Sequence, residues 1–164
     1  ARVPRLLLLL LSSSKSAAVA FAGPANKKIK SVKIPDTVTI GGVTYKVTSI
    51  QPKAFSRCYG LNRVTIGKNV TTIGEKAFYK CTKLKAITIP PKVIKIGKSA
   101  FEGCKKLKTI KIKTTKLTSK KVGSKAFTKT PKNMTVKVPK KKFDAYKTML
   151  MKRGVNKNAK FKKK

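Results

Sequence analysis

Three cysteines are the side chains of this chain with the most obvious chemical potential, and they recur at a fixed interval. Cys58, Cys81 and Cys104 are equally spaced along the sequence. Thiolates bind zinc or attack electrophilic carbon, but such sites also need histidine or well-placed carboxylates. The 164-residue sequence has no histidine and 4 acidic residues. The regular spacing therefore favours three buried, apolar cysteines stacked in a ladder.

The acidic residues do not form a catalytic pair. Asp36, Glu75, Glu102 and Asp144 are scattered, and no Gly-rich phosphate loop or nucleophile elbow accompanies them. We expect Glu75 and Glu102 to pair with nearby lysines. The sequence therefore predicts a protein that is not an enzyme and has no metal and no cofactor.

The cysteines belong to a longer phrase, Ala-Phe-x-x-Cys, that is repeated along the chain. Its aromatic residues are Phe55, Phe78, Phe101 and Phe127, which keep the spacing of the cysteines except that the last interval is slightly longer. The fourth copy has Thr130 in place of the cysteine. A fixed period of this length is the signature of a solenoid, in which Phe and Cys are structural core residues.

Further apolar columns surround each phenylalanine and predict the elements of one coil. Two columns separated by one residue predict a strand with one buried face: Val64, Ile87, Ile110 and Val136, then Ile66, Ile89, Ile112 and Val138. A third column, on the N-terminal side of each Phe, contains Ile50, Ile73, Ile96 and Val122. Each repeat is thus predicted to form two short extended segments and two tight corners.

Both ends of the repeat array carry candidate caps. Residues 31–47 alternate apolar and polar side chains around Gly41-Gly42, which predicts a β-hairpin. Downstream of Pro139, Phe143, Tyr146 and Leu150 have helical spacing and precede Gly154. We expect a hairpin cap at the N-terminal end and a helix of about three turns over the last coil.

The pattern Leu84-x-x-Ile87-x-Ile89-Pro90-x-x-Val93-x-x-Ile96-Gly97-x-x-Ala100-Phe101-x-x-Cys104 resembles the BspA-like, or Treponema-type, leucine-rich repeat of bacterial surface proteins. Residues 42–50 and 138–161 also resemble the flanking caps of such proteins. The resemblance implies a leucine-rich-repeat-like, mainly β solenoid. We expect a right-handed coil of about four 23-residue repeats. It also implies a secreted or cell-surface bacterial interaction and adhesion module without a shared catalytic residue.

Residues 1–25 are predicted to lie outside the solenoid. Arg2 and Arg5 precede Leu6 to Leu11, and Ala20-Phe21-Ala22 has the form of a signal-peptidase site. A secretory signal is therefore expected, with a disordered basic arm as the alternative. The apolar run is too short to span a bilayer. The predicted organisation is a signal-like segment at 1–25, a capped solenoid at 26–139, and a helical cap with a Lys-rich tail at 140–164.

The charge is strongly one-sided. Lys and Arg number 42 and the net charge is +38. These lysines are either the solvated surface of a solenoid or an attachment surface for an anionic partner, because ordinary surfaces mix both signs. An anionic cell-wall polymer, acidic glycan or acidic protein is the expected partner of a monomeric module. Nucleic acid binding is possible but non-specific, because Arg is scarce and the Phe residues are used in the core.

Period-two alternation turns the residues between the buried strand columns outward. The predicted ligand face contains Arg63, Thr65, Thr88, Thr109, Lys111, Lys113 and Lys137. The alternative is that the closing helix makes most contacts through Lys140, Lys141, Lys142, Lys147, Lys152 and Arg153. Two other functions stay open, a nucleic-acid-binding protein and a purely structural C-terminal module of a larger surface protein.

Overall fold

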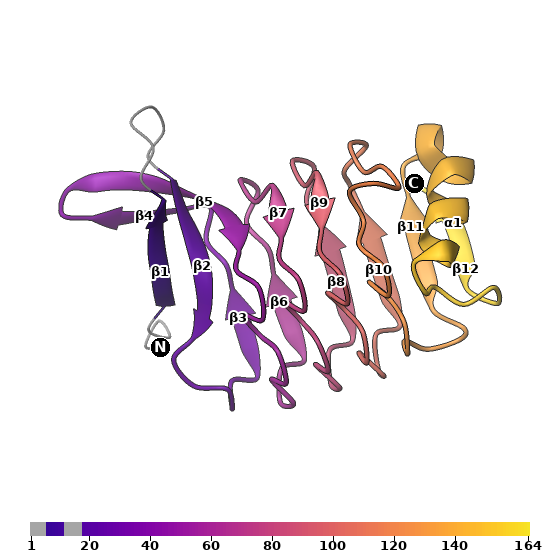
Figure 1. Ribbon diagram of the computed structural model, residues 1–164, viewed down its shortest axis with the longest axis horizontal. Helices are drawn as coiled ribbons and strands as arrows, with labels where there is room; N and C mark the ends of the chain where they lie inside the picture. The colour runs from indigo at the N-terminus through magenta and orange to yellow at the C-terminus, as the bar shows by residue number, and fades with distance from the viewer. Residues whose placement is uncertain (1–5, 12–17) are drawn as a thin grey trace.

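Successive coils stack side by side along one axis in the computed structural model, which describes residues 6–11 and 18–164 (Figure 1). The strands are β1 (Leu6–Leu11), β2 (Ala18–Pro24), β3 (Ser31–Lys33), β4 (Thr37–Ile40), β5 (Val43–Ile50), β6 (Arg63–Thr65), β7 (Thr72–Ile73), β8 (Ala86–Ile89), β9 (Lys95–Ile96), β10 (Thr109–Ile112), β11 (Thr135–Val138) and β12 (Lys160–Lys163). The helices are a 3-10 turn, Lys140–Lys142, and α1, Phe143–Lys152. The predicted mainly β solenoid is confirmed.

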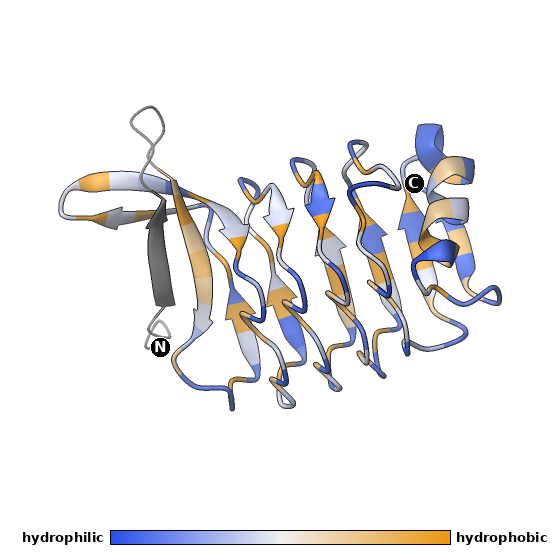
Figure 2. Cartoon of the chain, in the orientation of Figure 1, coloured by the Kyte–Doolittle hydropathy of each residue, from blue (hydrophilic) through white to orange (hydrophobic). Residues whose placement is uncertain are grey.

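On each of two faces of the solenoid, the strands of successive interior coils pair in parallel. One sheet has the order β12-β11-β10-β8, and β6 beside it pairs with β3. The other runs β1-β2-β5-β7-β9. The predicted columns are in register, with Ile87 opposite Ile110 and Ile110 opposite Val136. Figure 2 shows hydrophobic and hydrophilic residues alternating along these strands.

The Phe column is a continuous stack of buried rings. Phe55, Phe78, Phe101 and Phe127 are fully buried, and neighbouring ring centroids lie 5.1–5.4 Å apart. Their planes differ by at most 5°. One coil cannot bury such a ring by itself, so stacking of neighbours supplies the core.

The corner at each Phe has a distinctive backbone. Its N–H groups donate along the solenoid axis to the next coil: Lys76 to Lys98 O (2.9 Å), Phe78 to Ala100 O (2.8 Å) and Lys80 to Glu102 O (2.8 Å). Residues on both sides of the Phe adopt positive φ, including Lys53, Arg57, Lys76, Lys80, Lys125 and Lys129. A non-glycine residue in this region costs about 1–2 kcal/mol. The hydrogen bonds between coils offset this cost.

The cysteines form the predicted buried ladder. Cys81 Sγ donates to Phe55 O at 3.1 Å, and Cys104 Sγ donates to Phe78 O at 3.2 Å. Burial raises the pKa of all three thiols and that of Cys104 to about 12. In the fourth copy, Thr130 Oγ1 donates to Phe127 O of its own coil at 2.8 Å. These thiols are therefore protonated, apolar side chains near neutral pH.

The N-terminal end differs from the expectation. The hairpin forms, with β4 antiparallel to β5 around Gly41-Gly42, but it extends past β1 beyond the N-terminal end of the solenoid (Figure 1). The end is instead covered by β2, which pairs with β5 on one side and β1 on the other.

Residues 18–24, placed by the sequence in a signal-like segment outside the solenoid, form strand β2 within it. Phe21 is fully buried and lies 5.2 Å from the Phe55 ring, so it adds a fifth member to the stack. The hairpin makes the interval between Phe21 and Phe55 much longer than one repeat, which hides the earlier coil from a search for a fixed period. Residues 1–5 and 12–17 lie outside the described part, and cleavage of a signal stays a prediction.

The C-terminal cap forms as predicted and is anchored by a buried tyrosine. The Tyr146 hydroxyl of α1 donates to Thr114 O at 2.9 Å and accepts from Leu117 N–H at 3.1 Å. Thr114 and Leu117 belong to the segment that lengthens the fourth repeat, and both are buried. The extra residues therefore dock the helix, while a bridge between Ile96 and Val122 keeps the coil in register.

Candidate functional site

One face of the solenoid carries a row of outward side chains that the strand register aligns. We call the outer row the residues Lys33, Thr65, Thr88, Lys111, Lys137 and Lys162. Direct pairing joins Lys33 to Thr65, and it joins Thr88 through Lys111 and Lys137 to Lys162. All of these side chains are exposed except Lys111, which is half-buried. The predicted Thr65, Thr88, Lys111 and Lys137 therefore lie on one surface.

A second row runs parallel to the first along the same strands. It contains Ser31, Arg63, Ala86, Thr109, Thr135 and Lys160. The predicted Arg63 is exposed and Thr109 is half-buried. Small side chains occupy interior coils, Thr65 and Thr88 in the outer row and Ala86, Thr109 and Thr135 in the second, whereas lysines occupy the C-terminal end of both rows.

The C-terminal end of this face is the most basic part. Neighbouring strands are about 4.8 Å apart, which places Lys137 within one Debye length of both Lys111 and Lys162. Lys164 joins this group, because its N–H donates to Val138 O at 3.0 Å. Burial lowers the pKa of Lys164, and the charges of Lys111 and Lys113 lower it further. The predicted Lys113 thus contributes to the same positive field.

The basic residues of the closing helix do not form a comparable row. Lys141, Lys147 and Lys152 are exposed. Arg153 is used inside the fold, where its Nε donates to Val122 O and its Nη2 to Ser119 O, both at 2.7 Å. Lys147 Nζ lies 6.0 Å from the centroid of the Phe161 ring. The helix therefore offers separate charges, whereas the strand register sets charges at equal steps.

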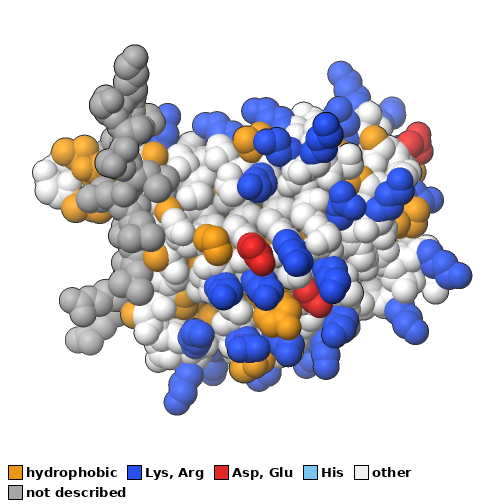
Figure 3. All heavy atoms as spheres, viewed as in Figure 1, with side chains coloured by type: hydrophobic (Ala, Val, Ile, Leu, Met, Phe, Trp, Pro, Cys, Tyr) orange, Lys and Arg blue, Asp and Glu red, His pale blue; other side chains and the backbone are white. Residues whose placement is uncertain are grey.

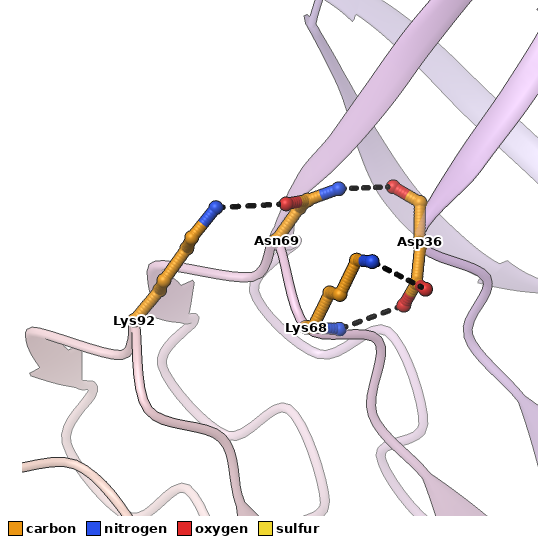
Figure 4. Close-up of polar contacts among 4 residues, drawn as sticks. All are labelled: Asp36, Lys68, Asn69 and Lys92. Carbon is orange, nitrogen blue, oxygen red and sulfur yellow. Dashed lines mark hydrogen bonds and ion pairs between the residues drawn. The ribbon is translucent and has the colours of Figure 1, made fainter.

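Acidic side chains do little to balance this charge. Asp36 Oδ1 accepts from Lys68 N–H at 2.8 Å, and Lys68 Nζ lies 3.9 Å from Asp36 Oδ2, the ion pair found among the described residues (Figure 4). Asn69 donates to the Asp36 carbonyl and accepts from Lys92 Nζ, each at 3.0 Å. The lysine partners expected for Glu75 and Glu102 are not found there at ion-pair distance. The expected pairing of Glu75 and Glu102 with nearby lysines is therefore absent from the described residues.

Figure 3 shows Lys and Arg side chains spread over the visible face and few acidic ones among them. The sequence missed Lys33, Lys162 and Lys164 as parts of the ligand surface. Lys33 is two residues further along the chain from Phe21 than Thr65, Thr88, Lys111 and Lys137 are from their own Phe residues. Strand β12 follows the helix and lies outside the repeat. Lys33 is identified only by the pairing of β3 with β6, and Lys162 only by the pairing of β12 with β11. Lys164 is identified by its backbone hydrogen bond to Val138.

No helix in the described part of the chain is long and apolar enough to cross a membrane.

Comparison with known proteins identifies the repeat. The family model for the BspA type leucine rich repeat region matches residues 18–151 in six copies, more than the four repeats counted from the sequence. No curated protein matches the chain.

The solved structures that are similar to this chain include the following two. A leucine rich cell surface protein from Faecalibacterium prausnitzii A2-165 has 29% identity and a TM-score of 0.66, over 82% of this chain and 35% of that one. The chain thus spans about a third of that protein's length. The T. pallidum leucine rich repeat protein shares the fold, with 20% identity and a TM-score of 0.58 over 82% of this chain and 69% of that one. The chain belongs to the BspA-type leucine-rich repeat family.

Proposed function

We propose that this chain is a non-enzymatic interaction module of a secreted or surface-attached bacterial protein, and that it binds a linear anionic polymer through the outer row. The observation that carries this proposal is the register of β10, β11 and β12, which sets Lys111, Lys137 and Lys162 in adjacent strands. The surface location is supported by family membership and by the similar cell surface protein.

The chemistry of the row suits a repeating anion better than a single small ligand. Lysine is a compact, strongly hydrated point charge, and successive strands repeat it at a step of about 4.8 Å. Like charges held this close repel each other, so a bound polyanion relieves repulsion that the free protein carries. Anionic cell-wall polymers and acidic glycans have this repeating charge.

A charge-reversal experiment tests the row against the helix. One variant carries Lys111→Glu, Lys113→Glu and Lys137→Glu, and the matched variant carries Lys141→Glu, Lys147→Glu and Lys152→Glu. Both change the net charge equally. We expect the first to lose binding to isolated Gram-positive cell walls by at least about tenfold at 150 mM salt, where only charges within about 8 Å of the ligand act strongly. Equal losses would overturn the assignment to the outer row.

Competition between ligands tests the class of partner. Wild-type protein bound to cell walls is challenged with poly(glycerol phosphate) and with duplex DNA at equal phosphate concentration. We expect the wall-type polymer to displace the protein more effectively. Stronger displacement by DNA would replace the proposal with a nucleic-acid-binding role, and absence of wall binding would leave a purely structural module.

A further inference from the structure

A second basic surface lies at the corner just after each Phe, several residues before the outer row in every repeat. It contains two neighbouring hollows. The first, of about 510 Å³, is lined by Lys27, Lys28, Arg57, Tyr59 and Gly60. The second, of about 350 Å³, is lined by Tyr59, Lys80, Thr82, Gly103, Lys105 and Lys129. Tyr59 lines both, and each hollow has three cationic residues and no acidic one.

The Tyr59 ring is available to a ligand. Its side chain is 52% exposed, which makes it the most exposed of the large hydrophobic residues in the described chain. Tyr79, one coil further, is different because its ring is already approached by Arg57, Lys76 and Lys80 at 5.9, 5.6 and 5.4 Å. Tyr59 therefore offers an aromatic face that the protein leaves uncovered.

A missing side chain opens the second hollow. In the four coils that contain Phe55, Phe78, Phe101 and Phe127, the residues two positions after the Phe are Arg57, Lys80, Gly103 and Lys129, all with positive φ. Among these four positions, which follow Phe55, Phe78, Phe101 and Phe127, Gly103 is the one without a long basic side chain. A Cβ at this position would lie 3.1 Å from Lys80 Cγ, the middle of a flexible side chain. Lys80 and Lys129, the equivalent residues of the two neighbouring coils, also have positive φ. The backbone conformation therefore does not require glycine at position 103, and Gly103 differs from them in leaving space where they have a side chain.

We infer that the Tyr59 corner binds an acidic sugar unit of an oligosaccharide. The apolar face of a sugar ring packs against the Tyr59 ring, and the carboxylate or sulfate of the same unit pairs with the cationic side chains that line the hollow, Lys27, Lys28 and Arg57 in the first and Lys80, Lys105 and Lys129 in the second. Nucleic acid fits less well, because single strands use successive aromatic platforms. The positions equivalent to Tyr59 in the later coils are Thr82, Lys105 and Pro131.

This site does not depend on the outer-row function, since it uses other residues and recognises a ring as well as a charge. It is tested with three small probes in a ¹H–¹⁵N NMR titration of the wild-type chain. Trigalacturonate has rings and carboxylates, maltotriose has rings only, and tripolyphosphate has charge only. We expect trigalacturonate to shift the amide resonances of Tyr59, Gly60 and Gly103 and to bind at least about tenfold more tightly than either other probe.

Two variants separate shape from charge. Tyr59→Ala is expected to weaken trigalacturonate binding about tenfold and to leave tripolyphosphate binding unchanged. Gly103→Lys adds a positive charge but fills the second hollow, so we expect weaker trigalacturonate binding than in wild type. Thr118→Lys is the matched control, because it adds the same charge at an exposed position in the lengthened fourth repeat.

Several results would overturn this inference. Tighter binding of trigalacturonate by Gly103→Lys, to the same degree as by Thr118→Lys, would mean that net charge alone acts. Equal binding of tripolyphosphate and trigalacturonate would have the same meaning. A trinucleotide is added as a fourth probe, and tighter binding of it than of trigalacturonate, with loss in Tyr59→Ala, would assign the corner to nucleic acid. The outer-row variant distinguishes the two proposals: if it loses cell-wall binding but still binds trigalacturonate at the Tyr59 corner, the two sites act independently.

Discussion

The Phe column and the outer row are built on the same repeat, yet stacking has opposite consequences in the two places. In the core, the identical Phe rings stack with centroids 5.1–5.4 Å apart, and this stacking stabilises the fold. On the surface, the similar spacing of neighbouring strands brings like charges together, which opposes folding. The row changes from Thr65 and Thr88 to Lys111, Lys137 and Lys162 along the axis. The buried columns thus stabilise the fold. The proposed binding of an anionic polymer depends instead on lysines whose mutual repulsion destabilises the free protein.

The largest effect is expected inside the stack. Phe78→Ala removes a fully buried ring with neighbours on both sides and should lower the free energy of unfolding by about 3–5 kcal/mol. Phe21→Ala removes a ring with one ring neighbour among the described residues, so its effect should be about 1 kcal/mol smaller. Chemical denaturation of both variants measures the difference. Equal loss would show that Phe21 has the environment of an interior coil, and no loss would exclude β2 from the folded solenoid.

A smaller effect is expected where the fourth coil departs from the column pattern. Tyr146→Phe keeps the ring but leaves Thr114 O and Leu117 N–H without the hydroxyl at a buried position. We expect a loss of about 1–3 kcal/mol in the free energy of unfolding. Thr148→Ala, at an exposed position of α1, is the control. If Tyr146→Phe lowered the free energy of unfolding by less than Thr148→Ala does, apolar contacts alone would hold the helix.

On the surface the sign should reverse. Lys111→Thr makes the row continue as Thr65 and Thr88 do, and it removes repulsion from Lys137 and Lys164. We expect an increase of about 0.5 kcal/mol in the free energy of unfolding at low salt, and less at high salt. Lys120→Thr, at an exposed position outside the row, should have little effect. Destabilisation by Lys111→Thr would show that the lysine stem contributes more through packing than its charge opposes.

The smallest effect concerns Lys164 and pH. Its pKa in the folded chain is lowered from 10.5, so the unfolded chain holds this proton more tightly and stability rises with pH between the two values. Lys164→Gln should therefore be slightly more stable than wild type near neutral pH, and this advantage should shrink as the pH approaches 10.5. Paired denaturation curves at several pH values measure the trend. An advantage that grows with pH would contradict the assigned direction.

The parts that sequence reasoning predicted are those in which the period repeats. Phe78, Cys81 and the Ile columns each have equivalents one period away, so their burial followed from comparison within the chain. The first coil did not follow, because the hairpin separates Phe21 from Phe55, and a short apolar run with small residues suits a secretion signal as well as an end strand. The Tyr59 hollows were also missed, since they depend on Gly103 and on loops from different coils.

The hydrogen bonds at the Phe corners give the molecule an electrical direction. Three peptide units per corner, Glu75-Lys76, Ala77-Phe78 and Tyr79-Lys80, point their N–H groups to the following coil and their carbonyls to the preceding one. Each peptide unit has a dipole of about 3.5 D, and aligned units add. The solenoid therefore has a macrodipole whose positive pole is at its C-terminal end, where the lysines of the outer row also gather. A long anionic chain would meet a potential that increases from coil to coil, and the two ends of the solenoid are not equivalent to it.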